Sequence, residues 1–280
     1  MIQEAISDLI ELALTEDLGD GDHSSLACIP DKASGRARLL IKEDGIIAGI
    51  DIARHVFRRI DKRIKLTECI TDGSNVSAGD TGFIAAGPVQ GLLKAERLIL
   101  NIIQRMSGIA TNTRMYVDAV SGYKAKILDT RKTSPGFRAF EKEAVRLGGG
   151  VNHRMGLFDM MMLKDNHIDY AGGIKNAITR ANEYLEKNKM DLQLVVEARN
   201  MDELKQILEQ GMLDRIMLDN FSIAETEIAV KLVGGRFEIE SSGGITLNTV
   251  RQYARCGVDY ISVGAITHQV KSMDISLKAL

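Results

Sequence analysis

The second half of the chain predicts a TIM-like α/β barrel, because strand-like and helix-like segments alternate there from residue 124 onward. The strand-like segments are short and apolar, and their ends carry charged residues or glycine. Strands that alternate with helices form parallel sheets through right-handed crossovers, as a barrel or an open sheet, and about seven of them favour the barrel. The expected strands are 126–130, 151–154, 160–164, 193–197, 215–219, 237–241 and 260–263, and helices are expected at 171–188, 201–211, 222–233 and 246–256.

Composition limits the classes of protein to which the chain can belong. Its 280 residues are 45% hydrophobic and 26% charged with a net charge of -2, as in a globular protein with one large core or two unequal domains. The near-neutral balance argues against a general nucleic-acid binder, which needs a basic face. No apolar run approaches the roughly 18 residues of a membrane helix, and residues 1–4 are unlike a signal peptide, so we expect a soluble, cytoplasmic protein.

The N-terminal region begins with two helices separated by a hairpin. Residues 1–16 have the periodicity of an amphipathic helix. Residues 36–50 predict a hairpin that turns at Asp44-Gly45, and a second helix is expected at 51–61. The apolar side of the first helix consists of Ile2, Ile6, Leu9, Ile10 and Ala13.

Short strands are expected near 64–70 and 81–93, on either side of a turn-rich segment at 72–80. This turn pattern resembles the sandwich domains that carry biotin or lipoate on a lysine at a hairpin tip. No lysine lies between Thr67 and Gly91, so a carrier function is not expected.

Neither the cysteines nor the acidic loop at 16–25 predicts a metal site. Cys28, Cys69 and Cys256 are widely spaced and form no CxxC pair, so free thiols are expected rather than disulfides or a zinc site. The acidic loop lacks the spacing of a calcium loop. A solvated loop or a helix cap is the favoured interpretation.

A long helix is expected over 94–121, interrupted near Ser107-Gly108. Its first part is apolar on nearly all sides, which predicts burial or a subunit contact. Arg97 lies within this apolar surface. It can form a salt bridge with a nearby carboxylate, or it can be a cation supplied to the site of another chain.

The cations between residues 129 and 168 differ in where they are placed. Arg138, Lys142 and Arg146 have the spacing of one helical stripe, which predicts a solvated face. Four others stand at or just after strand ends, where a cation costs desolvation unless an anion meets it. We therefore expect an anion-binding centre formed by Arg131, Lys132, Arg154 and Lys164.

In a barrel all strand ends face one mouth, where the active site lies. The last two strand ends carry Ser242-Gly243-Gly244 and Ser262-Val263-Gly264, and glycines there allow backbone N–H groups to approach a phosphate, helped by a helix that starts at Thr246. Glu197 and Asp219 end neighbouring strands. Two acids among cations suit a Mg²⁺ that bridges a pyrophosphate and ribose hydroxyls, and an ion pair with Lys164 or Arg131 is the alternative for either acid.

Several runs resemble the quinolinate phosphoribosyltransferases, also called carboxylating nicotinate-nucleotide pyrophosphorylases. Asp129-Thr130-Arg131-Lys132-Thr133 and Lys164-Asp165-Asn166-His167 are the most specific of these runs. The likeness covers essentially the whole chain in the right order. The other matching runs are 15–22, 96–97, 107–111, 134–136, 148–154, 217–220 and 242–245.

The resemblance implies a fold, an assembly and a reaction. The fold would be an N-terminal α/β sandwich at 1–110, onto which 268–280 packs back, and an open seven-stranded α/β barrel at 111–267. A homodimer or larger assembly would place each sandwich over the barrel mouth of the partner. With Mg²⁺, the reaction would join quinolinate to phosphoribosyl pyrophosphate and release pyrophosphate and CO₂, giving nicotinate mononucleotide for NAD biosynthesis.

The resemblance also implies residue roles. Arg131, His153, Arg154 and the partner subunit's Arg97 would hold the carboxylates of quinolinate, with Thr130 beside them. Lys132 and Lys164 would meet substrate carboxylate and pyrophosphate oxygens, Glu197 and Asp219 would order Mg²⁺ and the ribose hydroxyls, and the two glycine loops would take the 5′-phosphate. The catalytic set would be Lys132, Lys164, Glu197 and Asp219. The chain departs from the family at Val195, where members often carry a second glutamate.

Three other functions fit parts of the pattern. A related phosphoribosyltransferase could act on another aromatic acid. A barrel aldolase could form a Schiff base on Lys164, although that needs an apolar, low-pKa lysine and polar residues 165–167 follow this one. A non-catalytic sensor of phosphorylated metabolites would leave the full set of cations and acids superfluous.

Overall fold

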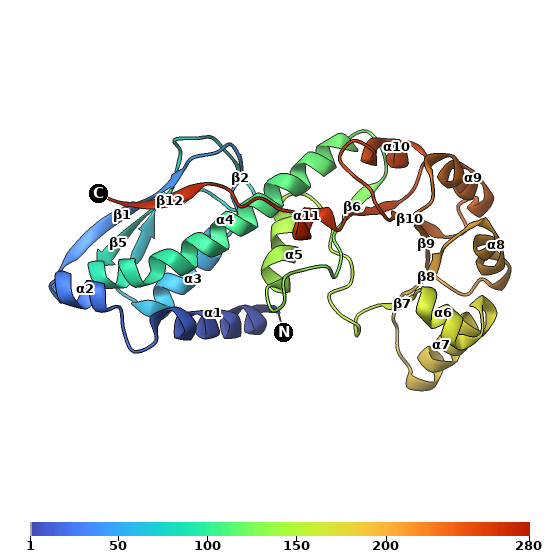
Figure 1. Cartoon of the computed structure of the whole chain (residues 1–280), viewed down its shortest axis with the longest axis horizontal. Helices are drawn as coiled ribbons and strands as arrows, with labels where there is room; N and C mark the ends of the chain where they lie inside the picture. Colours follow the sequence, from blue (N-terminus) through green and yellow to red (C-terminus); the bar gives the residue numbers. More distant parts are fainter. Residues whose placement is uncertain (1) are drawn as a thin grey trace. The chain divides into compact units, whose positions relative to one another are not determined.

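The computed structural model describes residues 2–280, with side chains from Glu4 onward. Met1 and the side chain of Ile2, both part of the expected first helix, lie outside the described residues. The chain forms two compact units (Figure 1). The first comprises the chain up to Arg114 together with Thr133–Gly149 and Ile266–Leu280, and the second comprises Met115–Lys132 and Gly150–Ala265.

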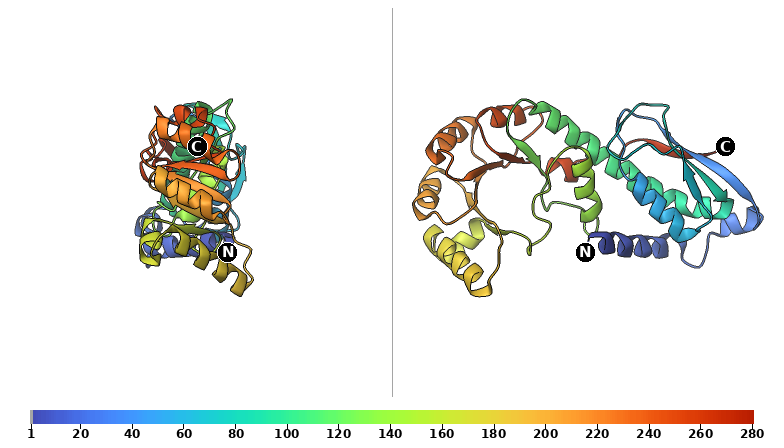
Figure 2. Two further views of the ribbon diagram at one scale, coloured as in Figure 1. Left: turned by 90° about the vertical axis from the view of Figure 1, so that its right-hand side faces the viewer. Right: turned by 180° about the vertical axis from the view of Figure 1, so that it is seen from behind.

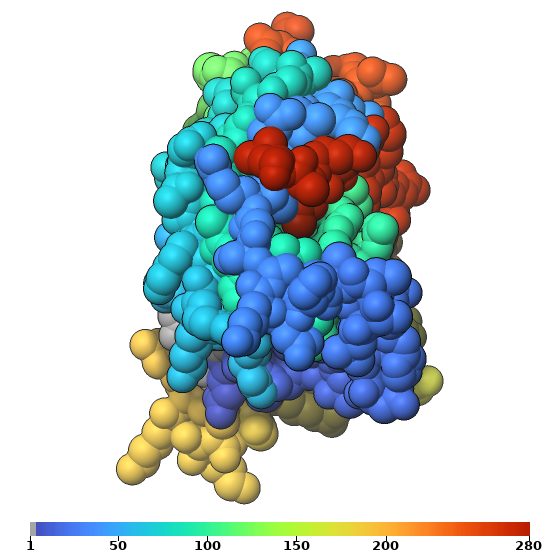
Figure 3. All heavy atoms as spheres, turned by 90° about the vertical axis from the view of Figure 1, so that its left-hand side faces the viewer, coloured from blue at the N-terminus to red at the C-terminus, as the bar shows by residue number. Residues whose placement is uncertain are grey.

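The first unit is built on a four-stranded antiparallel sheet with the order β12-β1-β5-β3. In the central strand β1, Ala37, Leu39 and Ile41 alternate with more exposed residues, so one face of the strand is buried. Figure 3 views this unit, with the C-terminal segment in red lying among blue residues of the N-terminal part. The strands are β1 (Ser34–Ile41), β3 (Lys65–Thr67), β5 (Thr81–Pro88) and β12 (Ile275–Ala279).

The expected hairpin at 36–50 is wrong. Strand β2 (Gly45–Ile46) pairs with β4 (Asn75–Val76) in a separate two-stranded sheet. Both edges of β1 are already taken by β5 and by β12, which is remote in sequence. The chain therefore leaves the main sheet after Ile41, and the Ile46 N–H donates to Thr111 Oγ1 at 2.9 Å.

Three helices, α1 (Ile2–Leu18), α2 (His23–Cys28) and α3 (Ile50–Ile60), precede the long helix of this unit. The acidic loop between α1 and α2 contains a helix cap, which confirms the favoured interpretation. The Asp22 carboxylate accepts the backbone N–H of Ser25 at 3.1 Å and so caps α2.

Helix α4 (Val89–Ala119) begins directly after Pro88 and continues through Ser107-Gly108, where an interruption was expected. Gly108 is needed for packing, because a Cβ there would collide with the backbone carbonyl of Lys271. Ser107 Oγ accepts the N–H of Ala48 at 3.0 Å. The apolar first part of this helix, for which burial or a subunit contact was expected, is buried within the chain itself at Ala95, Ile99, Leu100, Ile102 and Ile103.

Helix α5 (Arg138–Leu147) corrects the expectation of a solvated stripe. Lys142 is buried, and so is its neighbour Glu141, which accepts from Arg105 Nε at 2.9 Å and Nη2 at 2.6 Å. Arg146 is exposed and pairs with Glu143. Arg138, Lys142 and Arg146 do lie on one helix, as their spacing predicted. Residues 139–142, 144 and 145 are all buried, however, which leaves this helix little solvated surface.

The second unit contains a six-stranded parallel sheet with the order β6-β11-β10-β9-β8-β7 (Figures 1 and 2). Strands β6 and β7 are the two outer strands, so the sheet is open, and the predicted α/β class is confirmed. The expected strand at 151–154 is reduced to a single bridge between Val151 and Leu128. The strands are β6 (Lys126–Leu128), β7 (Met161–Leu163), β8 (Leu194–Ala198), β9 (Arg215–Asp219), β10 (Glu238–Ser242) and β11 (Tyr260–Ser262).

Helices lie on the outer side of this curved sheet (Figure 2). The expected helix at 171–188 begins only at Ile174, because Gly172 and Gly173 both adopt positive φ, and the short helix that ends just before them at Ala171 was not expected. The helix expected from Thr246 begins only at Val250, after a turn in which the Thr246 N–H donates to Thr249 Oγ1. The helices are α6 (Asp165–Ala171), α7 (Ile174–Asn188), α8 (Met201–Gln210), α9 (Ile223–Val233), α10 (Val250–Arg255) and α11 (Ala265–His268). Across residues 2–280, every helix is too short or too polar to cross a bilayer.

Candidate active site

The carboxyl ends of the parallel strands bring most of the expected site residues to one edge of the second unit. Parallel strands all run in the same direction, so their ends share an edge. The residues at or just after these ends are Asp129, Lys164, Glu197, Asp219, Ser242 and Ser262.

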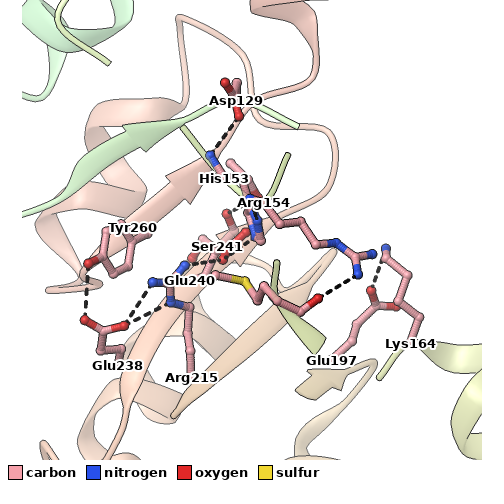
Figure 4. Close-up of polar contacts among 12 residues, drawn as sticks. Asp129, His153, Arg154, Lys164, Glu197, Arg215, Glu238, Glu240, Ser241 and Tyr260 are labelled. Atoms are coloured by element: carbon pink, nitrogen blue, oxygen red, sulfur yellow. Dashed lines mark hydrogen bonds and ion pairs between the residues drawn. The ribbon is translucent and has the colours of Figure 1, made fainter. Parts of the chain in front are cut away.

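Lys164 and Glu197 form an ion pair at this edge (Figure 4). The Lys164 Nζ lies 3.0 Å from Glu197 Oε2, and the Glu197 side chain is 5% exposed while that of Lys164 is 46% exposed. The ion-pair alternative considered for Glu197 is thus formed. The lysine retains enough exposure to meet a second anion.

The glycine loop after β10 is shaped by Asn220. Gly243 has a φ of +93°, and a Cβ there would collide with the side-chain amide of Asn220. That amide donates from Nδ2 to Asp219 Oδ2 at 2.8 Å, and the Asn220 N–H donates to the Ser242 carbonyl at 2.9 Å. Gly244 also has a positive φ and faces open space. The strand ends of β9 and β10 are therefore tied together, with a bare backbone between them.

The other predicted phosphate loop is largely buried. Ser262 is 5% exposed, and the Val263 N–H donates to the Leu128 carbonyl at 2.9 Å, which joins this loop to the end of β6. Thr130, in the loop after β6, uses its Oγ1 to accept the Lys132 N–H at 3.0 Å.

Arg154 is partly buried close to a second cation. Its Nη1 donates to the Met160 carbonyl at 3.2 Å. Burial, and next the positive charge of Arg131, lower the pKa of the Arg154 guanidinium, while Asp159 acts in the opposite direction. A partly desolvated cation that lies near a second positive charge forms a site that an anion stabilises.

His153 is held on three sides (Figure 4). Its backbone N–H donates to the buried carboxylate of Asp129 at 2.8 Å. Its ring Nδ1 accepts the backbone N–H of Arg154 at 2.7 Å, and its Nε2 lies 3.2 Å from Glu240 Oε2. The ring is 5% exposed.

Glu240 is fully buried in the middle of β10, and its neighbours keep it charged. Burial by itself would raise the pKa of Glu240, but His153, then Ser262 and Arg215, outweigh this and hold the pKa below its usual value. Arg215 Nη1 lies 3.2 Å from Glu240 Oε2, and Arg215 Nη2 lies 3.0 Å from Glu238 Oε2. The Arg215 guanidinium also stacks 3.9 Å from the ring centre of Tyr260.

Arg97 is the one expected site residue that belongs to the first unit. It is exposed on α4. The other expected residues lie on strands or loops of the second unit.

Known proteins resemble the chain over nearly its whole length. Residues 22–107 match the model of the quinolinate phosphoribosyl transferase N-terminal domain, and residues 109–278 match that of the C-terminal domain. The chain belongs to the quinolinate phosphoribosyltransferase family.

Individual relatives within the quinolinate phosphoribosyltransferase family agree with this assignment. Quinolinate phosphoribosyltransferase [decarboxylating] 1b of Nicotiana tabacum is 47% identical, over 96% of this chain and 81% of the relative. The nicotinate-nucleotide pyrophosphorylase [carboxylating] of Mycobacterium leprae is 40% identical, over 98% and 97%. The solved structure of the nicotinate-nucleotide pyrophosphorylase from Francisella tularensis has a TM-score of 0.92 and 42% identity, and covers 99% of this chain and 96% of its own.

The departure from the quinolinate phosphoribosyltransferase pattern at Val195 has a packing explanation. Val195 is buried in an apolar cluster with Met162 and Met217, and Met160 packs against it. No carboxylate precedes Glu197 on this face of β8. The carboxylate pair at the mouth is therefore Glu197 and Asp219, from neighbouring strands.

These two carboxylates fit a magnesium ion only as a partial ligand set. Among residues 2–280, no group of three or more His, Cys, Asp or Glu side chains could hold a metal. Mg²⁺ keeps several waters and is often bound by one or two carboxylates together with substrate phosphates. Glu197 and Asp219 would suit such an ion in a family whose second substrate is a pyrophosphate.

Sequence reasoning missed one buried acid of this site, Glu240. Glu238, Glu240 and Ser242 alternate along β10 and so share one face of the sheet. Strands of a parallel sheet are usually apolar on both faces, so two acids within five residues were a signal that this face is not an ordinary core.

Proposed function

We propose that the chain transfers the phosphoribosyl group of phosphoribosyl pyrophosphate to quinolinate and decarboxylates the product, giving nicotinate mononucleotide, pyrophosphate and CO₂. This is a step of NAD biosynthesis. The names of the curated relatives support the reaction. The observation that carries it for this chain is the partly buried Arg154 with the positive charge of Arg131 nearby.

Quinolinate suits these cations because it is an aromatic dicarboxylate. A guanidinium offers a planar fork of N–H donors that matches a carboxylate, so Arg131 and Arg154 would each bind one. The desolvation of Arg154 strengthens such a contact, since charges attract more strongly away from water. Lys132, on the exposed loop after Arg131, would add a further cation.

The reaction needs positioning and charge stabilisation more than proton transfer. The pyridine nitrogen attacks the anomeric carbon as pyrophosphate leaves, through a transition state with oxocarbenium character. Lys164, held by Glu197, would stabilise the departing pyrophosphate. Once the ring is ribosylated, its positive nitrogen stabilises the carbanion left at C2 when the 2-carboxylate departs as CO₂. C2 then takes a proton from water, so no general base is required.

The second substrate would occupy the ends of β9, β10 and β11. Gly243 and Gly244 would present backbone N–H groups to the 5′-phosphate, together with Ser242 and the loop after β11. Asp219 and Glu197 would hold the ribose hydroxyls and a Mg²⁺. When bound, that ion supplies positive charge to the pyrophosphate oxygens.

We further propose a homodimer in which Arg97 of one subunit completes the site of the other. Arg97 is exposed, so it is available to a partner.

The deciding experiment is an assay of the purified chain with quinolinate, phosphoribosyl pyrophosphate and Mg²⁺, with detection of both nicotinate mononucleotide and CO₂. We expect turnover with quinolinate, loss of turnover in EDTA, and none with nicotinate, which lacks the second carboxylate. Turnover of another pyridine acid without CO₂ release would contradict the assignment. The aldolase alternative predicts covalent trapping of Lys164 by borohydride with a carbonyl substrate, and its ion pair with Glu197 makes that outcome unexpected.

A further inference from the structure

Both ring nitrogens of His153 lie against groups of the protein, in a ring that is 5% exposed. Nδ1 accepts the Arg154 N–H at 2.7 Å, so in the neutral ring the proton sits on Nε2. Nε2 lies 3.2 Å from Glu240 Oε2. Both ring nitrogens therefore face protein groups, and the ring is positioned to orient the backbone of Arg154.

From this we propose that Glu240 is a positioning residue for the quinolinate site. Glu240 holds the His153 imidazole through Nε2, so that Nδ1 stays on the Arg154 amide and the Arg154 guanidinium is kept where it meets a substrate carboxylate. The proposal rests on the function proposed above, in which Arg154 binds quinolinate. It assigns His153 an indirect role in place of direct contact with the substrate.

Glu240 can act in this way because it is itself firmly held. Arg215 contacts it, and Arg215 in turn is bound by Glu238 and stacked on Tyr260. Arg215, Glu238 and Tyr260 are the first residues of β9, β10 and β11, so the chain of contacts runs from the amino ends of these strands towards the mouth (Figure 4). Strands provide a more rigid base for a site than loops do.

A carboxylate in this place is not explained by stability alone. Taking a charged pair out of water costs free energy that its mutual attraction only partly returns, and apolar residues of similar volume often serve as well. A carboxylate does offer a histidine one fixed tautomer and ring orientation, as in other sites where an acid orients a histidine.

The first test compares Glu240→Gln with Glu238→Gln in the full chain. Both acids lie on the same face of β10 and contact Arg215, but only Glu240 contacts His153. We expect Glu240→Gln to raise the KM for quinolinate roughly 10-fold or more, as losses of orienting partners commonly do, with the KM for phosphoribosyl pyrophosphate unchanged. Glu238→Gln reaches the site only through Arg215, so it should raise the KM for quinolinate by a smaller factor than Glu240→Gln does.

A double-mutant cycle separates positioning from general damage. In an Arg154→Lys background, Glu240→Gln should add little further loss, because the two residues act along one path. The proposal would be overturned if Glu240→Gln raised the KM for quinolinate by the same factor in the wild-type and Arg154→Lys backgrounds. An equal rise in the KM values for quinolinate and for phosphoribosyl pyrophosphate would also overturn it. A wild-type chain that does not turn over quinolinate would instead overturn the proposed function, so the two failures are distinguishable.

If Glu240→Gln folds poorly, variants of His153 test the same idea. The side-chain oxygen of Asn can replace Nδ1 as acceptor for the Arg154 amide, whereas the longer Gln reaches towards Glu240 as Nε2 does. We expect His153→Asn to retain a lower quinolinate KM than His153→Gln. Equal values or the reverse order would show that the Arg154 contact is not what His153 supplies.

Discussion

Arg154 and Arg146 carry the same charge in different surroundings. Arg146 lies on the exposed side of α5 and pairs with Glu143. Burial, and next the cation Arg131, lower the pKa of the partly buried Arg154. A paired surface cation contributes little to stability or binding. A desolvated cation beside another cation is strongly stabilised when an anion binds to it. At the scale of the residue, surroundings rather than charge decide which arginine is suited to bind an anion.

Removing either site arginine should abolish most quinolinate turnover while leaving the fold intact. Arg131→Ala and Arg154→Ala each leave a bound carboxylate without its partner, a loss of about 2–5 kcal/mol in kcat/KM. Steady-state kinetics and thermal melts measure the two effects. Arg146→Ala is the matched control and should be nearly neutral. Near-normal kcat/KM in either site variant would remove that residue from the site.

Glu240 should make the stability of the chain sensitive to acid. Its pKa is below its usual value in the folded state, so it contributes stability that is fully present above its unfolded pKa. That contribution is lost as the pH falls below about 4.3 towards the folded pKa. Urea unfolding of wild type and Glu240→Gln at several pH values should give a free-energy difference that shrinks with falling pH. A constant difference would contradict the pKa direction.

At the scale of the element, the turn after β10 and the turn after β9 depend on each other. Asn220 bonds the Ser242 carbonyl through its backbone and Asp219 through its side chain. The same side chain occupies the space that any side chain at position 243 would need. The glycine at 243 is thus fixed by its neighbour as well as by its own positive φ.

Gly243→Ala should therefore weaken the use of phosphoribosyl pyrophosphate. The substitution imposes strain of about 1–2 kcal/mol at positive φ, and the turn must also move away from Asn220. We expect the KM for phosphoribosyl pyrophosphate to rise on the order of ten-fold, with a smaller change for quinolinate. Gly79→Ala, at a φ of +101° with no close neighbour, is the control for backbone strain alone. An unchanged KM for phosphoribosyl pyrophosphate in Gly243→Ala as well as in Gly79→Ala would contradict the proposal that this loop binds the phosphate.

The predictable elements were those set by local pattern, and the mistaken ones depend on distant segments. The strands at 193–197, 215–219 and 237–241 were found within one residue because short apolar runs and helical periodicity alternate there. The hairpin at 36–50 failed because β12, far along the chain, takes one edge of β1. A helix break at Gly108 was expected from composition, whereas the glycine is needed for contact with Lys271.

In the candidate site too, the residues placed by local pattern could be predicted, and the contacts between distant segments could not. Lys164, Glu197 and Asp219 could be placed because strand ends of a parallel sheet share an edge. The burial of Lys142 and the contact between His153 and Glu240 could not, because each depends on side chains brought together from separate elements.

At the scale of the whole molecule, the two units are not two consecutive stretches of chain. Residues 133–149 were expected in the barrel domain, but they cluster with the first unit, where α5 carries Glu141 to Arg105. The segment from Ile266 also returns to that unit. Neighbouring residues such as Arg131 and Ser134 therefore belong to different units.

Mixing two inactive variants should restore activity if Arg97 acts on a partner's site. Arg97→Ala and Lys164→Ala chains, exchanged by mild denaturation, should form heterodimers in which one site carries both lesions and the other neither. Heterodimers make up about half of an equal mixture, so activity should approach roughly a quarter of wild type. Each variant refolded alone is the control. No recovery despite demonstrated heterodimers would mean that Arg97 serves its own subunit.

The pairing of β1 with β12 bears on how the chain folds as it leaves the ribosome. β1 and β5 emerge early, but residues 275–279, which complete the sheet, are synthesised after the whole second unit. Until then one edge of β1 lacks its partner and can pair with other chains. The second unit is made nearly all in one stretch from residue 150 to 265, and within its sheet it is the early strand β6 that waits for its partner β11. The first unit is thus begun first and completed last. A chaperone would help this chain most by covering the unpaired edge of β1 during translation.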